Sequence, residues 1–145
     1  MCGICGQFRF DGNEVSIKSL DSMMIKLARR GPDSSGQWIS QNIGFGHQRL
    51  SIIDLSSHGS QPMIDEKLKL TLVFNGTIYN YKSLRFQLLK KGYNFFSHSD
   101  TEVILKAYHF WGENCLEHLD GMFAFAIWDH STKKLFLARD RMGIK

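Results

Sequence analysis

Residues 122–129, MFAFAIWD, constrain the fold more than any other stretch, because apolar side chains occupy both sets of alternating positions. Residues 134–140, KLFLARD, follow after the turn at residues 130–133, which predicts a β-hairpin. A strand that is apolar on both sides belongs in a sheet that is covered on both faces. The hairpin therefore predicts a layered structure with a packed sheet inside it.

The rest of the chain alternates between strand-like and helical patterns. A helix begins after Ser16, whose hydroxyl can cap it, and ends at Gly31-Pro32. Asn75-Gly76 predicts a turn, Asp100 can cap a helix, and residues 54–67 have no regular pattern. Further strands are predicted at residues 4–10, 37–40, 43–49, 69–74 and 93–96, and further helices at residues 80–91, 101–111 and 113–118. This pattern predicts one mixed domain of mostly antiparallel strands, compatible with two stacked sheets with helices outside.

Composition narrows the class of protein. The 145 residues suffice for one domain, and 43% of them are hydrophobic. The net charge of +4 comes from scattered pairs of basic residues, which gives little support to nucleic-acid binding. No apolar run approaches the roughly 20 residues of a membrane helix, and the N-terminus does not have the pattern of a signal peptide. We therefore expect a cytoplasmic protein with no membrane partner, in which the three cysteines form no disulfide framework.

The opening residues, MCGICG, allow three interpretations. Cys2 can be an ordinary small residue, or Cys2 and Cys5 can be a metal or redox pair. Alternatively, removal of Met1 leaves Cys2 as the first residue, with its thiol and α-amine on one carbon. A tetrahedral metal site needs four ligands, but the remaining cysteine, Cys115, is isolated and the six histidines lack ligand spacing. We therefore expect no metal site, with Cys5 and Cys115 as small hydrophobic residues.

A terminal cysteine would need several supporting groups. An α-amine has a pKa of about 7.7–8.0 and can act as the base for the thiol. Asn75-Gly76 after a strand offers two donors for an oxyanion, although this dipeptide is also common in turns. Arg49 can bind a carboxylate and Asp100 an ammonium group. Each has an ordinary interpretation too, as a surface charge and a helix cap respectively.

A series of motifs identifies a family. In order, the chain contains Cys2-Gly3-Ile4, Arg30-Gly31-Pro32-Asp33, HQRLSIID (47–54), Gln61-Pro62-Met63, Phe74-Asn75-Gly76, Ile78-Tyr79-Asn80, SDTE (99–102), GMFAFA (121–126) and Arg139-Asp140-Arg141. This series closely resembles the N-terminal glutaminase domain of asparagine synthetase-type class II glutamine amidotransferases, over the whole chain. The resemblance implies an α+β fold, the N-terminal-nucleophile hydrolase sandwich of four αββα layers with two mainly antiparallel sheets.

The resemblance also implies a reaction. Cys2 would attack the side-chain amide of glutamine, giving glutamate and ammonia through a thioester. Asn75 and Gly76 would stabilise the oxyanion, while Arg49 would hold the glutamine carboxylate and Asp100 its ammonium group. Arg30 to Asp33 and His47 would be scaffolding without a catalytic step. The implied glutamine-binding residues are Arg49, Leu50, Ser51, Ile52, Ile53, Asn75, Gly76, Thr77 and Asp100.

In this family a C-terminal synthetase domain uses ATP and Mg²⁺ to activate a carboxyl group, which receives the ammonia through a tunnel. We expect residues 1–145 to be a glutaminase domain, truncated at its C-terminal end, whose synthetase partner lies in the same polypeptide. No cofactor is expected for the glutaminase domain itself, and a homodimer remains open. The acceptor also remains open. Asparagine synthetases usually read NGEIYN where this chain has Thr77 in place of the glutamate.

The chain is similar to the branch that amidates N-acetylglutaminylglutamine in three features taken together: the opening MCGICG, Thr77 and the stretch from Tyr93 to Gly112. Sugar carboxylates are further alternatives as acceptors. The same fold also occurs in glucosamine-phosphate synthase and amidophosphoribosyltransferase. A catalytically silent regulatory domain is a third kind of alternative, against which the presence of Cys2, Arg49, Asn75, Gly76 and Asp100 argues.

Overall fold

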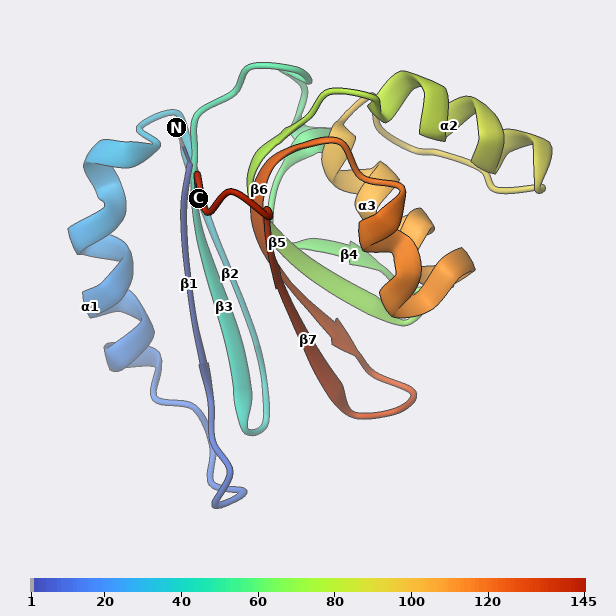
Figure 1. The fold of residues 1–145 in the computed structure, drawn as a ribbon. Helices are drawn as coiled ribbons and strands as arrows, with labels where there is room; N and C mark the ends of the chain where they lie inside the picture. Colours follow the sequence, from blue (N-terminus) through green and yellow to red (C-terminus); the bar gives the residue numbers. More distant parts are fainter. Residues whose placement is uncertain (1) are drawn as a thin grey trace.

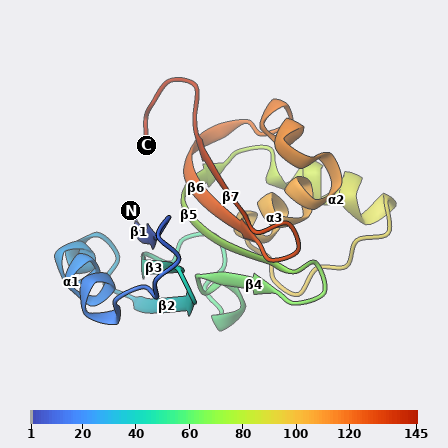
Figure 2. The same cartoon turned by 90° about the horizontal axis from the view of Figure 1, so that it is seen from below.

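A computed structural model describes residues 2–145, in which two antiparallel sheets face each other (Figure 1). The first sheet has the order β1-β3-β2 and the second the order β4-β5-β6-β7. The bounds are β1 (Gly3–Phe8), β2 (Ser34–Ser40), β3 (Ile43–Arg49), β4 (Met63–Asp65), β5 (Leu70–Ile78), β6 (Gly121–Asp129) and β7 (Lys134–Arg139). Helices cover the outer face of each sheet, so the predicted α+β arrangement of four layers is confirmed (Figure 2).

Three α-helices form the outer layers. α1 (Ile17–Leu27) packs on β1 and β3, and the hydroxyl of Ser16 caps it by accepting the N–H of Ser19 at 3.3 Å. α3 (Asp100–Trp111) packs on β5, and α2 (Tyr81–Lys90) packs on α3. Short 3-10 helices follow at Ala28–Arg30, Ser57–Gly59 and Gly112–Glu117. Among residues 2–145, no helix has the length and apolarity to cross a membrane.

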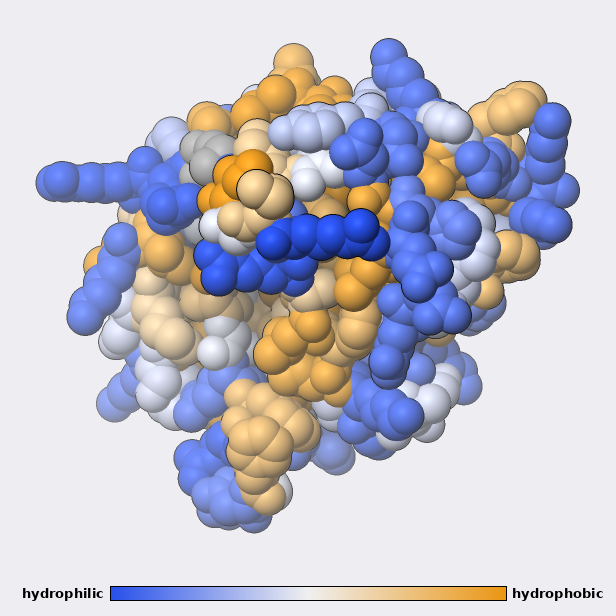
Figure 3. Space-filling model, in the orientation of Figure 1, coloured by the Kyte–Doolittle hydropathy of each residue, from blue (hydrophilic) through white to orange (hydrophobic). Residues whose placement is uncertain are grey.

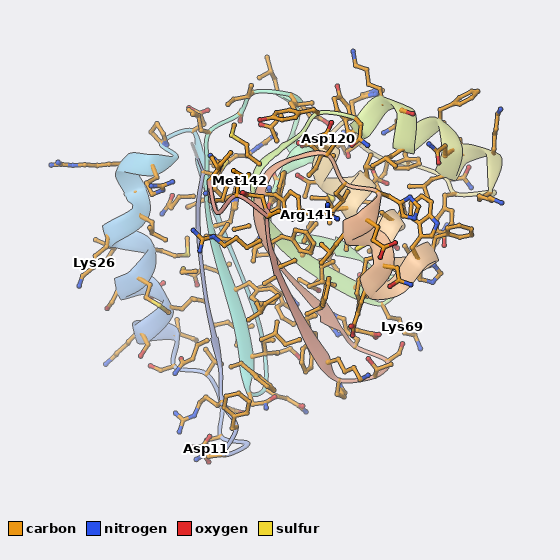
Figure 4. All side chains as sticks on the ribbon, in the orientation of Figure 1. Asp11, Lys26, Lys69, Asp120, Arg141 and Met142 are labelled. Carbon is orange, nitrogen blue, oxygen red and sulfur yellow. The ribbon has the colours of Figure 1, made fainter. Side chains whose placement is uncertain are left out.

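The two hydrophobic cores explain the apolar run of residues 122–129. Phe123, Phe125 and Ile127 of β6 face the helices α2 and α3, whereas Ala126 and Trp128 pack between the sheets. Side chains from both sheets fill this central layer (Figure 4). Both faces of β6 are therefore buried, as its sequence predicts.

The central layer opens at one side into an apolar cleft of about 610 Å³ between the edge strands β1 and β7. Phe8, Phe10 and Leu137 are among its lining residues. Apolar side chains gather on the face that this opening occupies (Figure 3). The pocket described below lies elsewhere in the same layer, at the start of β1 and the end of β3.

The predicted turn at Asn75-Gly76 is wrong. Both residues lie inside β5 and pair with Ala124 and Phe123 of β6. A side chain at Gly76 would overlap the carbonyl oxygen of Met122, so the glycine permits close approach of two strands. The pairing with the long apolar strand β6 overrides the turn preference of the dipeptide.

Three other local predictions need correction. Residues 93–96 form no strand, because Tyr93 and Phe95 pack against the helical core instead. Residues 54–67, predicted as irregular, contain β4 and a 3-10 helix. The cap of α3 is Ser99, whose hydroxyl accepts the N–H of Glu102 at 3.3 Å, and Asp100 is the first residue of the helix.

Candidate active site

One pocket of about 190 Å³ contains every residue that the sequence analysis assigned to catalysis or glutamine binding. The pocket lies where β1 begins and β3 ends. The assigned residues along its wall are Cys2, Arg49, Leu50, Ser51, Ile52, Ile53, Asn75, Gly76, Thr77 and Asp100. Residues from four separate parts of the chain therefore meet in one cavity.

The thiol of Cys2 is held against the backbone of Leu50. The N–H of Leu50 points at Sγ at 3.3 Å, and Sγ lies 3.6 Å from the carbonyl oxygen of Leu50. The antiparallel pairing of β1 with β3, which sets Gly3 opposite Gln48, brings these residues together. Arg30 donates from Nε to the carbonyl oxygen of Cys2 at 3.2 Å, and this contact fixes the backbone of Cys2.

Arg49 ends β3 and is 8% exposed. Its Nη1 donates to the carbonyl oxygen of Ser56 at 2.9 Å, and its Nη2 donates to that of Asp54. Because a guanidinium carries five N–H donors, others remain for a ligand. A Cβ atom at Gly59 would lie 2.5 Å from Nη2, so a side chain there would require the guanidinium to shift. The cation is thus fixed before any ligand binds.

The edge of β5 supplies a backbone donor to the pocket. The N–H of Phe74 donates to Oε1 of Gln61 at 2.6 Å, and the N–H of Ile78 donates to Oδ2 of Asp100 at 3.0 Å. Donors alternate between the two edges of a strand, so the N–H of Gly76 lies on the same edge, between these two. Phe123, opposite Gly76, instead bonds with Asp140 on the other side of β6.

The side chains of Asn75 and Thr77 project from the face of β5 that is turned towards the first sheet. Val73 packs into the core between the sheets, and side chains two residues apart share a face of a strand. Asn75 and Thr77 therefore face the space between the sheets, where the pocket lies. The Asn75 amide and the Gly76 N–H are two donors at one end of the pocket, an arrangement that can stabilise an oxyanion.

Asp100 is 5% exposed, and burial raises the pKa of its carboxyl group against the lowering effect of the N–H groups of Ile78, Asp100 and Thr101. The ion pairs within residues 2–145 include neither Asp100 nor Arg49. A buried charge without a partner is unfavourable unless a ligand supplies the opposite charge. A guanidinium and a buried carboxylate that make no ion pair, both in one small pocket, suit a zwitterion such as an amino acid.

Several lining residues escaped the sequence analysis. Gln61 joins β5 to α3, because its amide accepts from Phe74 and donates to the hydroxyl of Thr101 at 3.3 Å. Gln61 belongs to the motif Gln61-Pro62-Met63, but no local sequence pattern indicated what its side chain does. The other lining residues that were missed are Asp54, Gly59, Phe74, Ser99, Thr101 and Met122.

The two scaffolding motifs lie next to the site. Asp33 accepts the N–H of Ser51 at 2.7 Å and so holds the loop after Arg49. His47 is 1% exposed, and burial lowers its pKa to about 4, with a further lowering from the charge of Arg49. The imidazole lies against the backbone of Phe74, which raises the pKa slightly, but within residues 2–145 neither ring nitrogen has a partner with good hydrogen-bond geometry. His47 is therefore neutral at neutral pH.

The other two cysteines lie outside the pocket. Burial raises the pKa of the Cys5 thiol, whose Sγ lies 3.8 Å from the carbonyl oxygen of Gly46. Burial and the charge of Glu113 raise the pKa of Cys115 to about 12. Within the described part of the chain, no group of three or more His, Cys, Asp or Glu side chains could hold a metal ion.

Two antiparallel sheets between helical layers form the sandwich fold of the N-terminal-nucleophile hydrolases, and the thiol of Cys2 lies beside a pocket at the start of the first strand. Residues 1–145 match the family described as glutamine amidotransferase domain, and the chain belongs to that family. The resemblance that the motifs carry is thereby confirmed. The predicted removal of Met1 concerns a residue outside the described residues 2–145.

Relatives align over the whole chain. It is 43% identical over 148 residues to asparagine synthetase [glutamine-hydrolyzing] 3 of Bacillus subtilis and 39% identical over 157 residues to amidase chry2 of Gibberella zeae. The alignments cover 100% of this chain but 24% and 23% of those proteins, so the chain spans about a quarter of their length.

Solved structures share the fold. The glutamine phosphoribosylpyrophosphate amidotransferase from B. subtilis superposes with a TM-score of 0.81 at 21% identity, over 99% of this chain and 38% of that one. The structure titled as the allosteric regulatory enzyme of purine biosynthesis superposes with a TM-score of 0.76 at 20% identity. At these identities the likeness concerns the fold alone, and it agrees with the predicted sandwich.

Proposed function

We propose that this domain hydrolyses the side-chain amide of glutamine to glutamate and ammonia, with Cys2 as the nucleophile. The observation that carries the proposal is the pocket itself. The cavity is lined by the Cys2 thiol, by Asn75 and Gly76, by the Arg49 guanidinium and by the buried carboxylate of Asp100. The membership of the chain in the glutamine amidotransferase family gives independent support.

The reaction begins after removal of Met1, which frees the α-amine of Cys2. This amine takes the thiol proton while Sγ attacks the amide carbon, and the Asn75 amide and the Gly76 N–H stabilise the resulting oxyanion. The ammonium group then gives its proton to the leaving nitrogen, the C–N bond breaks, and ammonia and a thioester remain. Water attacks the thioester with the amine again as base, which releases glutamate and restores the thiol. These steps need no cofactor in this domain.

Substrate recognition follows from the two charges. The free donors of Arg49 bind the α-carboxylate of glutamine, and Asp100 binds its α-ammonium group. The segment 50–53 lines the side-chain channel beside Cys2. Thr77 offers a hydroxyl where asparagine synthetases usually carry a carboxylate, so Asp100 carries the recognition of the ammonium group.

The ammonia is used by a second domain. The length of the relatives supports a synthetase domain in the same cytoplasmic polypeptide, which receives the ammonia through a tunnel and needs ATP and Mg²⁺. The acceptor is an activated carboxyl group, that of aspartate in an asparagine synthetase-like reaction. N-acetylglutaminylglutamine is the alternative, which the similarity of MCGICG, Thr77 and residues 93–112 to that branch supports.

Release of glutamate from glutamine by the purified protein tests the proposal. Cys2→Ala should abolish release, and Cys5→Ala should retain it because Cys5 lies outside the pocket. Activity that survives in Cys2→Ala would overturn the role of Cys2. A wild-type protein that binds glutamine without releasing glutamate would instead indicate a silent regulatory domain.

A further inference from the structure

We propose that Asp54 is a positioning residue that sets the distance between the two ends of the glutamine pocket, Arg49 and Asp100. The inference rests on the proposed function and adds a residue to which neither the motifs nor the family match assigned a role. Asp54 is 8% exposed and borders the pocket. Its place in the hydrogen-bond network, described next, distinguishes it from a substrate ligand.

Both carboxylate oxygens of Asp54 are occupied by protein donors. Oδ1 accepts the N–H of Ser56 at 2.9 Å and the hydroxyl of Ser56 at 2.6 Å, and Oδ2 accepts the N–H of His98 at 2.8 Å. Burial pushes the pKa of Asp54 up, but the bonds from Ser56 and His98 bring it below its usual range. The carboxylate is therefore ionised, and both of its oxygens accept hydrogen bonds from the protein.

The first arm of this network reaches Arg49. The hydrogen bonds that Ser56 donates to Asp54 close a turn, and that turn presents the two carbonyl oxygens, of Asp54 and Ser56, that accept from the guanidinium. The guanidinium lies between this turn and Gly59, where a side chain would collide with it. The shape of the turn thus fixes where the carboxylate of glutamine is bound.

The second arm reaches Asp100. His98, which donates to Asp54 across a separation of 44 residues, stands two positions before Asp100. Ser97 and Ser99 on either side are tied to α3, through the carboxylate and the N–H of Glu102 respectively. The segment 97–99 is thus held against α3 by Glu102. The hydrogen bond from His98 to Asp54 joins this segment to the turn that holds Arg49.

Kinetic constants distinguish a positioning role of Asp54 from a purely stabilising one. If Asp54 sets the distance between the two charges, its loss weakens glutamine binding but leaves the thiol and the oxyanion donors in place. KM should then rise while kcat stays nearly constant. A merely structural role would lower the melting temperature and the amount of active protein without changing KM.

The test measures kcat, KM and melting temperature for glutamine hydrolysis by Asp54→Ala, Asp54→Asn and a matched control, Asp129→Asn. Asp129 closes a similar turn after β6, accepting the N–H groups of Ser131 at 2.8 Å and Thr132 at 3.2 Å, and it lies outside the pocket. We expect Asp54→Ala to raise KM about tenfold or more, the scale of a lost hydrogen bond to a charged group, with kcat within about threefold.

Asp54→Asn should give an intermediate KM. The amide oxygen of the asparagine can accept the hydrogen bonds from Ser56 or the one from His98, whereas its NH₂ group can accept neither. Asp129→Asn should leave KM unchanged even if its melting temperature falls. Should Asp54→Ala fail to fold, the isosteric Asp54→Asn still provides the comparison.

A double-mutant cycle tests whether Asp54 and Asp100 act together on KM. In an Asp100→Asn background the ammonium contact is already weakened, so Asp54→Ala should raise KM by a smaller factor than in the wild type. An unchanged KM in both Asp54 variants, or equal effects in the two backgrounds, would overturn the positioning role while glutamine hydrolysis by the wild type stands. A wild type that does not hydrolyse glutamine would overturn the proposed function and this inference with it.

Discussion

The sulfur of Cys2 lies 3.3 Å from the backbone nitrogen of Leu50, although 48 residues separate the two in sequence. The register of β1 on β3 produces this contact, because Gly3 stands opposite Gln48. The loop after Arg49 is thereby placed beside Cys2, and the second sheet supplies the opposite wall with Asn75 and Gly76. The site is thus a product of how two sheets pair and stack.

Replacement of Asn75 tests the oxyanion donors. Asn75→Ala should lower kcat for glutamine hydrolysis by about 10²–10³-fold, the scale of losing one such donor, with a small change in KM. Asn94→Ala, at an exposed position outside the pocket, is the matched control and should behave as the wild type. A loss below about threefold in Asn75→Ala would exclude the side chain from the oxyanion site.

Replacement of Arg49 tests the carboxylate contact. Arg49→Lys keeps a positive charge but cannot bind a carboxylate through a planar fork, so KM should rise about tenfold. Arg49→Ala should raise it further, since the charge is lost as well. Steady-state kinetics with both variants check the order. Equal KM values in the wild type and Arg49→Ala would contradict the assignment.

Asp100→Asn should make the protein more stable and less able to bind glutamine. Burial raises the pKa of Asp100 in the folded state, so its contribution to stability is present below the unfolded-state pKa and is lost as pH rises. At neutral pH the buried carboxylate is therefore destabilising, and a neutral amide relieves this. Asp129→Asn should have the opposite effect on the melting temperature, because the pKa of Asp129 is lowered: burial raises it, but bonds from Thr132 and Ser131 outweigh burial.

Thermal melts at pH 7 and glutamine titrations measure both quantities for Asp100→Asn. A melting temperature that falls, together with unchanged glutamine binding, would show that Asp100 is a structural residue and not the ammonium partner.

His47 should make the free energy of unfolding depend on pH in the acidic range. Its folded-state pKa is about 4, below the ordinary 6.5, so its stabilising contribution is fully present above about pH 6.5 and is lost as pH falls towards 4. The loss is on the order of 3 kcal/mol. Urea unfolding across this range should give a shallower pH dependence for His47→Gln than for the wild type. Parallel curves would rule out His47 as the source.

Some features of this chain could be predicted from local sequence. The MFAFAIWD hairpin and the Ser16-capped helix have strong periodic patterns, and both are confirmed. Asn75-Gly76 was predicted as a turn because the dipeptide favours one locally, whereas nine residue pairs between β5 and β6 decide its conformation. The roles of Gln61 and Asp54 depend on hydrogen bonds to residues 40 and 44 positions away, which leave no periodic signal.

The most direct test of the central claim is an intact mass measured before and after treatment with a glutamine analogue whose side chain ends in a diazoketone. Attack by the thiolate would displace N₂ and leave a carbon–sulfur bond. Because their raised pKa values make Cys5 and Cys115 poor nucleophiles, we predict a protein without Met1 that gains one adduct, mapped to Cys2. Retained Met1, no adduct, or an adduct on Cys5 or Cys115 would contradict the assignment of Cys2 as a terminal nucleophile in a glutamine pocket.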